Sequence, residues 1–245
     1  TSSPIVLKGT EDVVTKVGQA RRGGATGVFL SPGYAKACAD ELAKSISCSV
    51  LMKISSSATG YQVPHQEIFF GNVEEAVYLG AAGVVVLVPL EKENEPEIIR
   101  SLGKLGEDCD RYGMVFLIEA EFPTAYHVQL KKSGMEQYGL EYLRRSVRLS
   151  AELGADIIKT NWTGDVETFA ELVSLSPVPV VVAGGSRESD RDLLTKLELA
   201  IKAGAIGCSV GRNIFQHRDA ELMTRAICKV VIENKSVDEA LSVLE

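Results

Sequence analysis

The chain of 245 residues is 45% hydrophobic and 24% charged, with a formal net charge of −7 and a pI near 5.2. This composition is that of a globular protein with a sizeable core and excludes a disordered chain. The negative charge argues against a surface that neutralises nucleic-acid phosphates. No apolar stretch approaches the roughly 18 residues of a membrane span, and no secretory leader pattern opens the sequence. We therefore expect a cytoplasmic protein without a nucleic-acid or membrane partner.

The cysteines and histidines do not form a metal-binding pattern. The five cysteines are scattered, include no C-x-x-C pair and have no neighbouring histidine at ligand spacing. They predict reduced, mostly buried thiols. His65, His127 and His217 are equally scattered and are expected on the surface or in loops. No metal site is predicted.

A recurring junction organises the chain from its first quarter to its last. Four times an amphipathic stretch ends in Gly-Ala and is followed by a short apolar run, with the glycines at Gly24, Gly80, Gly154 and Gly204. Glycine at such a position can adopt the left-handed conformation that ends a helix. The apolar run is typical of a strand buried on both faces. The repeat predicts alternating helices and parallel strands.

Filling the intervals gives eight candidate strands, at residues 4–8, 27–31, 49–55, 83–88, 115–121, 156–161, 178–183 and 207–211. Eight such units in a chain of this length favour a closed α/β structure, the (β/α)8 TIM barrel, which is usually about 250 residues long. An open doubly wound sheet gives similar local signals, but no G-x-G-x-x-G follows the first strand. No Pro-rich or low-complexity linker divides the chain, so a single domain over residues 1–245 is expected.

In either architecture ligands bind at the carboxyl ends of the strands, which directs attention to Lys159. Lys159 ends the run Ala-Asp-Ile-Ile-Lys. A desolvated lysine is shifted toward the neutral amine that attacks carbonyl groups. The strand pattern alone allows a second interpretation, a lysine whose charge reaches solvent at the barrel rim.

Two carboxylates lie at the end of the fifth expected strand. Because side chains alternate along a strand, Glu119 and Glu121 share one face, and Phe116, Ile118 and Phe122 fall on the other. The apolar face should pack on the helices, so both carboxylates should point into the barrel mouth. There they can act as general acid or base, with Lys159 or Lys53 as ionic partners. Structural ion pairing is the alternative.

The seventh and eighth expected strands run directly into polar, glycine-containing turns. The first turn contains Gly184, Gly185 and Ser186, and the second contains Gly211 and Arg212. Loops after these two strands form the usual phosphate site of β/α barrels, with backbone N–H groups as donors. The pair of turns predicts binding of a substrate phosphate, with simple tight turns as the alternative.

Three segments together resemble a known family. Ile-Ile-Lys-Thr-Asn-Trp-Thr-Gly-Asp ending at Asp165, Val-Val-Ala-Gly-Gly ending at Gly185, and Val-Gly-Arg-Asn-Ile-Phe-Gln-His ending at His217 are similar to the DeoC/FbaB-like class I aldolases. Within that family the similarity is greatest to archaeal-type fructose-bisphosphate aldolases and 2-amino-3,7-dideoxy-D-threo-hept-6-ulosonate synthases. The resemblance implies a (β/α)8 barrel, a homo-oligomer, and Lys159 as the Schiff-base lysine. It also implies no cofactor or metal, because the protonated imine is itself the electron sink.

Two departures from the family pattern concern the groups that assist the lysine. The family's first strand ends in Asp-His-Gly, whereas this chain has Lys8-Gly9-Thr10. The family's fifth strand carries a tyrosine followed by Pro-Arg-Gly, whereas this chain has Glu119-Ala-Glu-Phe-Pro-Thr. If the two sequences are aligned on Pro123, Phe122 replaces the tyrosine. If they are aligned so that inward-facing side chains match, Glu121 replaces it, and we favour this second alignment.

The sequence therefore predicts a Schiff-base aldolase or transaldolase that acts on a ketose phosphate or a related phosphorylated carbonyl compound. Lys159 is the expected nucleophile, Glu121 or Glu119 the proton carrier, and Lys53 an ionic partner. The alternative is a divergent barrel without aldolase activity that binds phosphometabolites or serves as an assembly subunit.

Overall fold

The computed structural model describes residues 7–57, 67–90, 95–122 and 139–245. Within these ranges seven parallel strands form one sheet in the order β1-β2-β5-β6-β7-β8-β9. These strands are β1 (Gly27–Leu30), β2 (Ser49–Lys53), β5 (Gly83–Leu87), β6 (Val115–Ala120), β7 (Ile157–Thr160), β8 (Val180–Ala183) and β9 (Gly207–Ser209). A separate antiparallel pair, β3 (Ser55–Ser57) and β4 (Glu67–Phe69), follows β2.

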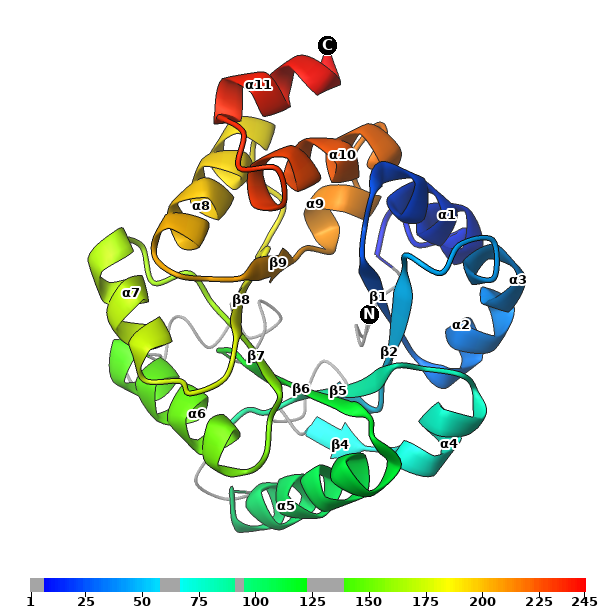
Figure 1. Ribbon diagram of the computed structural model, residues 1–245, viewed down its shortest axis with the longest axis vertical. Coiled ribbons are helices and arrows are strands. Elements are labelled where there is room, and N and C mark those ends of the chain that lie inside the picture. The colour runs from blue at the N-terminus through cyan, green and yellow to red at the C-terminus, as the bar shows by residue number, and fades with distance from the viewer. Residues whose placement is uncertain (1–6, 58–66, 91–94, 123–138) are drawn as a thin grey trace.

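Helices surround the curled sheet as a ring (Figure 1). The longer ones are α1 (Val13–Gly23), α5 (Glu95–Tyr112), α6 (Leu140–Glu152), α7 (Val166–Ser174), α8 (Asp190–Lys202) and α10 (Ala220–Val231). Shorter ones are α2 (Pro32–Ala37), α3 (Ala39–Leu42), α4 (Val73–Tyr78), α9 (Arg212–Phe215), α11 (Val237–Leu241) and a final 3₁₀ turn (Ser242–Leu244). This arrangement agrees with the expected β/α barrel. Among the described residues, no helix has the length and apolar character needed to cross a membrane.

The four Gly-Ala junctions have the predicted backbone conformation. The φ angles of Gly24, Gly80, Gly154 and Gly204 are 104°, 73°, 92° and 103°. At the first junction the N–H of Gly24 donates to carbonyl oxygens in the last turn of α1. Since L side chains rarely adopt such angles, glycine is required for the abrupt change from helix to strand.

Of the first expected strand, residues 4–8, the first three residues lie outside the described ranges, and Leu7 and Lys8 are not in a strand. The chain turns at Lys8 and Gly9, with the N–H of Thr10 donating to the Leu7 carbonyl at 3.0 Å. Gly9 has φ of 89°, and a Cβ on it would lie only 2.1 Å from the Phe215 carbonyl oxygen. The turn therefore packs closely against the end of α9, next to the carboxyl end of β9.

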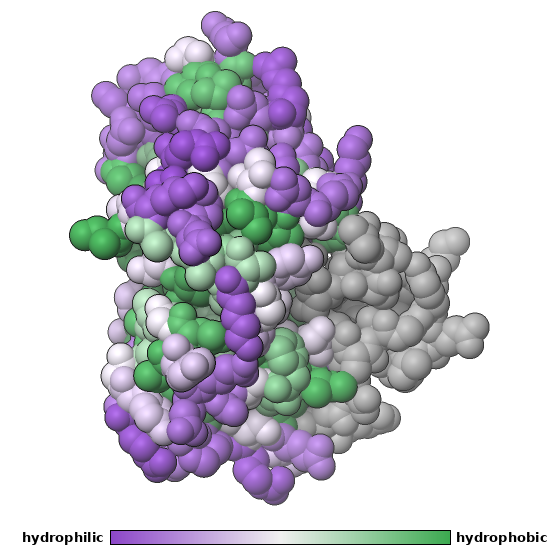
Figure 2. All heavy atoms as spheres, turned by 90° about the vertical axis from the view of Figure 1, so that its right-hand side faces the viewer, coloured by the Kyte–Doolittle hydropathy of each residue, from purple (hydrophilic) through white to green (hydrophobic). Residues whose placement is uncertain are grey.

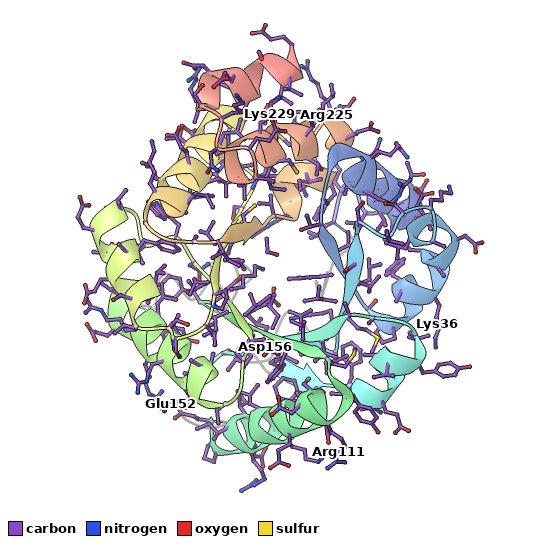
Figure 3. The ribbon with its side chains drawn as sticks, in the orientation of Figure 1. Lys36, Arg111, Glu152, Asp156, Arg225 and Lys229 are labelled. Atoms are coloured by element: carbon purple, nitrogen blue, oxygen red, sulfur yellow. The ribbon has the colours of Figure 1, made fainter. Side chains whose placement is uncertain are left out.

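Alternation along the strands separates the core from the barrel interior. Val84, Val86, Phe116, Ile118 and Ile158 are fully buried and belong to the large hydrophobic cluster that joins the sheet to the helices. The intervening residues of the same strands face the interior. The periphery of the helix ring carries charged residues, among them the labelled Lys36, Arg111 and Glu152 of Figure 3. Burial on both faces explains why the strands are short apolar runs.

Candidate active site

Lys159 and two glutamates meet inside the barrel at the carboxyl ends of β6 and β7. Glu119 and Lys159 are register partners on these neighbouring strands, so their side chains leave the sheet at the same level. The Nζ of Lys159 lies 2.7 Å from Glu119 Oε1 and 2.8 Å from Glu121 Oε1. The three side chains are 10–13% exposed. Lys159 is therefore not a rim charge in solvent but an ammonium held between two carboxylates.

A second lysine extends this cluster across the barrel. The ammonium of Lys53, at the end of β2, donates a short hydrogen bond to the other carboxylate oxygen of Glu119 and lies 3.9 Å from Glu67 Oε1. The Glu67 side chain, on β4, is completely shielded from solvent. Lys53 thus pairs with Glu119 as expected. Glu67 was not foreseen, because nothing in the sequence indicated a strand pair between β2 and α4.

The two glutamates beside Lys159 have opposite electrostatic environments. Burial opposes ionisation of Glu119, but the charges of Lys159 and Lys53 outweigh it and hold the pKa of Glu119 well below its usual range. Burial dominates at Glu121 and raises its pKa, with only partial compensation by Lys159. The pKa of Lys159 is raised, because the two carboxylates outweigh the burial that would lower it. Carboxylates whose pKa values are pushed apart are suited to different roles.

An aromatic ring completes the surroundings of Lys159. The ring of Phe29, on β1, has its centroid 5.9 Å from the Lys159 Nζ. An ammonium at this distance from an aromatic face is attracted by the ring quadrupole.

The residues just after β6 follow the alternation expected from the sequence. Glu121 points into the barrel toward Lys159, whereas the Phe122 ring stacks on Tyr142 of α6 at 5.9 Å between centroids. The backbone N–H of Phe122 donates to Asn161 Oδ1 at 2.7 Å, which ties this segment to the end of β7. The orientation therefore agrees with the alignment in which Glu121, and not Phe122, stands at the position of the family's tyrosine.

The two glycine-containing turns lie side by side at the carboxyl ends of β8 and β9. The N–H of Gly184 donates to the Ser209 carbonyl at 3.0 Å, and a Cβ on Gly184 would come within 3.0 Å of Val210. Gly185, with φ of 74°, and Ser186 are exposed, and Gly211 precedes the half-buried Arg212 at the start of α9. The five residues predicted to bind phosphate are thus brought together at one edge of the barrel mouth.

Asn213 fastens these turns to each other. Its fully buried side chain donates to the carbonyls of Gly184 and Ser186 at 3.3 and 2.9 Å and accepts from the N–H of Glu188 at 3.0 Å. From the sequence, Asn213 was only one residue of the motif that ends at His217, and no role was predicted for it. Its hydrogen bonds show that it shapes the first turn from the second.

Comparison with known proteins identifies the family. The family model described as DeoC/LacD family aldolase matches residues 1–217. The chain belongs to this family. The resemblance and the β/α-barrel fold expected from the sequence are thereby confirmed, and the comparisons favour a Schiff-base aldolase over a barrel without enzymatic activity.

Individual relatives of this aldolase agree with the assignment. It is 30% identical to the 2-amino-3,7-dideoxy-D-threo-hept-6-ulosonate synthase of Halobacterium salinarum, over 96% of this chain and 85% of that protein. It is 31% identical to synthase 1 of the same name from Archaeoglobus fulgidus, over 87% of this chain and 76% of that protein. Among solved structures, it resembles an archaeal fructose-1,6-bisphosphate aldolase whose catalytic lysine is bound to a carbinolamine intermediate, at 27% identity and a TM-score of 0.78. That match covers 90% of this chain and 84% of the other.

Other polar residues of the aldolase lie away from the Lys159 cluster. His217, expected on the surface or in a loop, lies in the loop between α9 and α10 and is buried there: its Nε2 lies 3.2 Å from Asp190 Oδ2 and its Nδ1 accepts from the N–H of Asp219 at 3.0 Å. His217 therefore links α8 to the start of α10, and none of its contacts among the described residues is with Lys159. His65 and His127 lie outside the described ranges. The five cysteines are free thiols, three buried and two half-buried.

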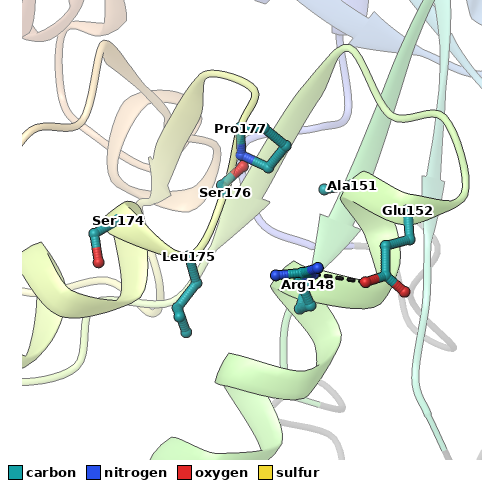
Figure 4. Close-up of a pocket in the computed structure, with 7 residues that line it drawn as sticks. All are labelled: Arg148, Ala151, Glu152, Ser174, Leu175, Ser176 and Pro177. Carbon is teal, nitrogen blue, oxygen red and sulfur yellow. Dashed lines mark hydrogen bonds and ion pairs between the residues drawn. The ribbon is translucent and has the colours of Figure 1, made fainter.

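Two surface depressions lie at the opposite end of the barrel. The larger, of about 420 Å³, is lined by the carboxyl ends of α6 and α7, including Arg148 and Glu152 (Figure 4). The other, of about 360 Å³, lies beside Asp156 and Met114 at the amino ends of β6 and β7. Because ligands of β/α barrels bind at the carboxyl ends of the strands, we do not place the active site in either depression.

Proposed function

We propose that this chain is a class I aldolase or transaldolase in which Lys159 forms a Schiff base with a phosphorylated ketose or hydroxyketone. The observation that carries the proposal is the position of the Lys159 amine, between two buried carboxylates at the carboxyl end of β7. A lysine fixed on a strand is held in one place for attack on a carbonyl carbon. The relatives named as synthases and aldolases support the same chemistry.

Proton transfer within the cluster prepares the nucleophile. The resting Lys159 is an ammonium, since its pKa is raised, and it must lose a proton before it can attack. Glu121 lies 2.8 Å away and has a raised pKa, so it is the carboxylate that accepts this proton. Glu119 stays ionised, because Lys53 and Lys159 lower its pKa. The transfer exchanges a buried ion pair for a neutral amine and a neutral acid, which avoids an uncompensated buried charge.

The remaining steps reuse the same groups. The amine adds to the carbonyl carbon and passes one of its own protons to the carbonyl oxygen. Protonated Glu121 supplies the second proton, so that this oxygen leaves as water. The resulting iminium is positive, as the ammonium was, and Glu119 faces it. When the adjacent carbon–carbon bond breaks, its electron pair moves into the iminium to give an enamine, and a proton is removed from the hydroxyl of the departing aldehyde. Glu121, which is ionised again at this stage, is the base that accepts this proton.

The substrate phosphate is proposed to bind at the turns after β8 and β9. Gly184, Gly185, Ser186, Gly211 and Arg212 lie together there, and backbone N–H groups and an arginine are suitable donors to a phosphate dianion. Since the Lys159 cluster and these turns lie at the same end of neighbouring strands, a phosphate bound at the turns places the rest of a small ketose over Lys159.

We further propose a cytoplasmic, single-domain protein that associates with copies of itself. Tyr34 of α2 and Val77 and Tyr78 of α4 are 47%, 40% and 87% exposed. Figure 2, which faces the α1 to α4 side, shows hydrophobic side chains among hydrophilic ones there. Burial of such side chains favours association. Light scattering should give a mass above that of one chain, and a monomer at micromolar concentration would contradict this part of the proposal.

Borohydride trapping tests the proposed function. The protein is incubated with a panel of ketose and hydroxyketone phosphates, reduced, digested and mapped by mass spectrometry. We expect one adduct, on Lys159 and not on Lys53, and none in Lys159→Met. Lys202→Met, which changes an exposed lysine paired with Glu198, is the matched control and should keep the adduct. The absence of an adduct with every member of the panel would contradict Schiff-base chemistry.

A further inference from the structure

A partly buried ammonium lies beside the first of the two turns. The Nζ of Lys196, on α8, donates to the Gly184 carbonyl at 2.8 Å and also contacts the Glu188 carboxylate. The Lys196 side chain is only 15% exposed. It reaches the turn from α8, in the helix layer. It is thus a charged group at the turn that is not itself one of the residues predicted to bind phosphate.

A further contact places the same ammonium against the turn after β8. A Cβ built on Gly185 would lie 3.7 Å from the Lys196 Nζ, so the ammonium is directly adjacent to the left-handed residue of the turn. On the β9 side, burial raises the pKa of the Cys208 thiol to about 12, and the Lys196 charge acts in the opposite direction. Lys196 is therefore adjacent to the turn after β8 and close enough to β9 for its charge to act on the Cys208 thiol.

We propose that Lys196 is a positioning residue that holds the Gly184–Ser186 turn in the shape that binds the substrate phosphate. This inference rests on the phosphate site proposed above. The observation that supports it is the set of hydrogen bonds to the carbonyl groups of this turn. The Lys196 ammonium and the Asn213 side-chain amide both donate to the Gly184 carbonyl, and Asn213 also donates to the Ser186 carbonyl. Because these two carbonyl oxygens are hydrogen-bonded to protein groups, they are held away from the space in which an anion would bind.

The Lys196 ammonium and the Glu188 carboxylate form an ion pair beside the proposed phosphate site. The pair is neutral as a whole, so it does not leave an uncompensated charge in the protein when the site is empty. Its positive end lies beside the turn, while the carboxylate is supplied by the residue four positions beyond Gly184. A bound phosphate would therefore meet the positive end of this pair first, across the backbone of the turn.

A matched pair of ligands separates this role from a general structural one. Dihydroxyacetone phosphate and dihydroxyacetone differ only in the phosphate, and inorganic phosphate tests the site without any carbonyl. Binding of inorganic phosphate is measured by phosphorus NMR titration of the intact protein, and the rate of imine formation by borohydride trapping with each ketone. The variants are Lys196→Met, Lys196→Arg and, as a control on the same helix, Lys202→Met.

Lys196→Met should raise the dissociation constant of inorganic phosphate about tenfold or more, because a charge-assisted hydrogen bond to the turn is lost. Trapping with dihydroxyacetone phosphate should require correspondingly more ligand, and trapping with dihydroxyacetone should change less than twofold. Lys196→Arg should recover most of the phosphate affinity, and Lys202→Met should match the wild type.

Three outcomes would overturn the inference, and each points to a different failure. Unchanged phosphate affinity in Lys196→Met would show that the ammonium does not shape the site. Equal weakening with both ketones, together with a lower melting temperature, would show a general structural role. Absence of phosphate binding to the wild-type protein would remove the phosphate site itself, whereas failure of the Lys159 adduct alone would leave the Lys196 result standing.

Discussion

The sharpest consequence of the two unlike carboxylates is the effect of Glu121→Gln. The substitution keeps the size of the side chain and an oxygen that can accept from Lys159, but it removes the group that takes the lysine proton. Glu119 cannot replace it, since Lys53 and Lys159 hold its pKa low. General acid–base catalysis typically contributes about 10²- to 10⁴-fold. The expected loss in the rate of imine formation is therefore of that order, or roughly 3–5 kcal/mol in the barrier.

The assay is the rate of borohydride-trapped adduct as a function of pH, at saturating hydroxyketone phosphate. The pKa of Glu121 is raised, so its proton-accepting form is lost as the pH falls through that raised value, and the wild-type rate should fall on this acid side. Glu121→Gln should be slow across this range and should lack the fall in rate that belongs to Glu121, so that its rate rises with pH only as the Lys159 ammonium loses its proton. Glu152→Gln, which changes an exposed partner of Arg148, is the control. A Glu121→Gln rate within threefold of wild type, with the same pH profile, would refute the assignment.

Three further predictions concern the surrounding groups. Lys53→Met leaves the buried Glu119 carboxylate with Lys159 as its remaining cationic partner. Urea denaturation should show a free energy of unfolding lower by about 3–5 kcal/mol. A change under about 1 kcal/mol would contradict a stabilising role of the Lys53–Glu119 ion pair. The pKa of Glu119 is lowered on folding, so its stabilisation is present above the unfolded value of about 4.3 and is lost as the pH falls toward the folded value. Urea titrations should therefore show a smaller loss of stability on acidification in Glu119→Gln, and an unchanged slope would contradict it. Gly184→Ala places a Cβ within 3.0 Å of Val210 and should weaken binding of inorganic phosphate by NMR titration, while dihydroxyacetone still traps at Lys159; undiminished phosphate affinity would contradict the close approach.

The strands and the helix ends were predictable because their causes are local. Glycine before a buried apolar run has few conformational alternatives, and all four such glycines, Gly24 among them, have positive φ. Seven expected strands agree with the structure to within two residues at each end. Side-chain alternation likewise predicted that Glu119 and Glu121 face inward, because the opposite face of β6 is wholly apolar.

The features that escaped prediction depend on contacts between distant residues. Glu67 reaches Lys53 only because β4 folds back on β3, a pairing without a hydrophobic or turn signal in the sequence. In the sequence, Lys196 is indistinguishable from the other charged residues of an amphipathic helix. Its role depends on the packing of α8 against the Gly184 turn, where it donates to the Gly184 carbonyl. His217 is buried because Asp190 and the Asp219 backbone satisfy both ring nitrogens, which no local pattern indicates.

The assignment of the Lys159 amine as the nucleophile is tested most directly by the identity of the reduced adduct. Two lysines, Lys53 and Lys159, contact Glu119 in the barrel interior, so a peptide map of the borohydride-trapped protein distinguishes them. The account predicts a single adduct on Lys159 that disappears in Lys159→Met and persists in Lys202→Met. An adduct on Lys53, or none with any ketose or hydroxyketone phosphate, would contradict it.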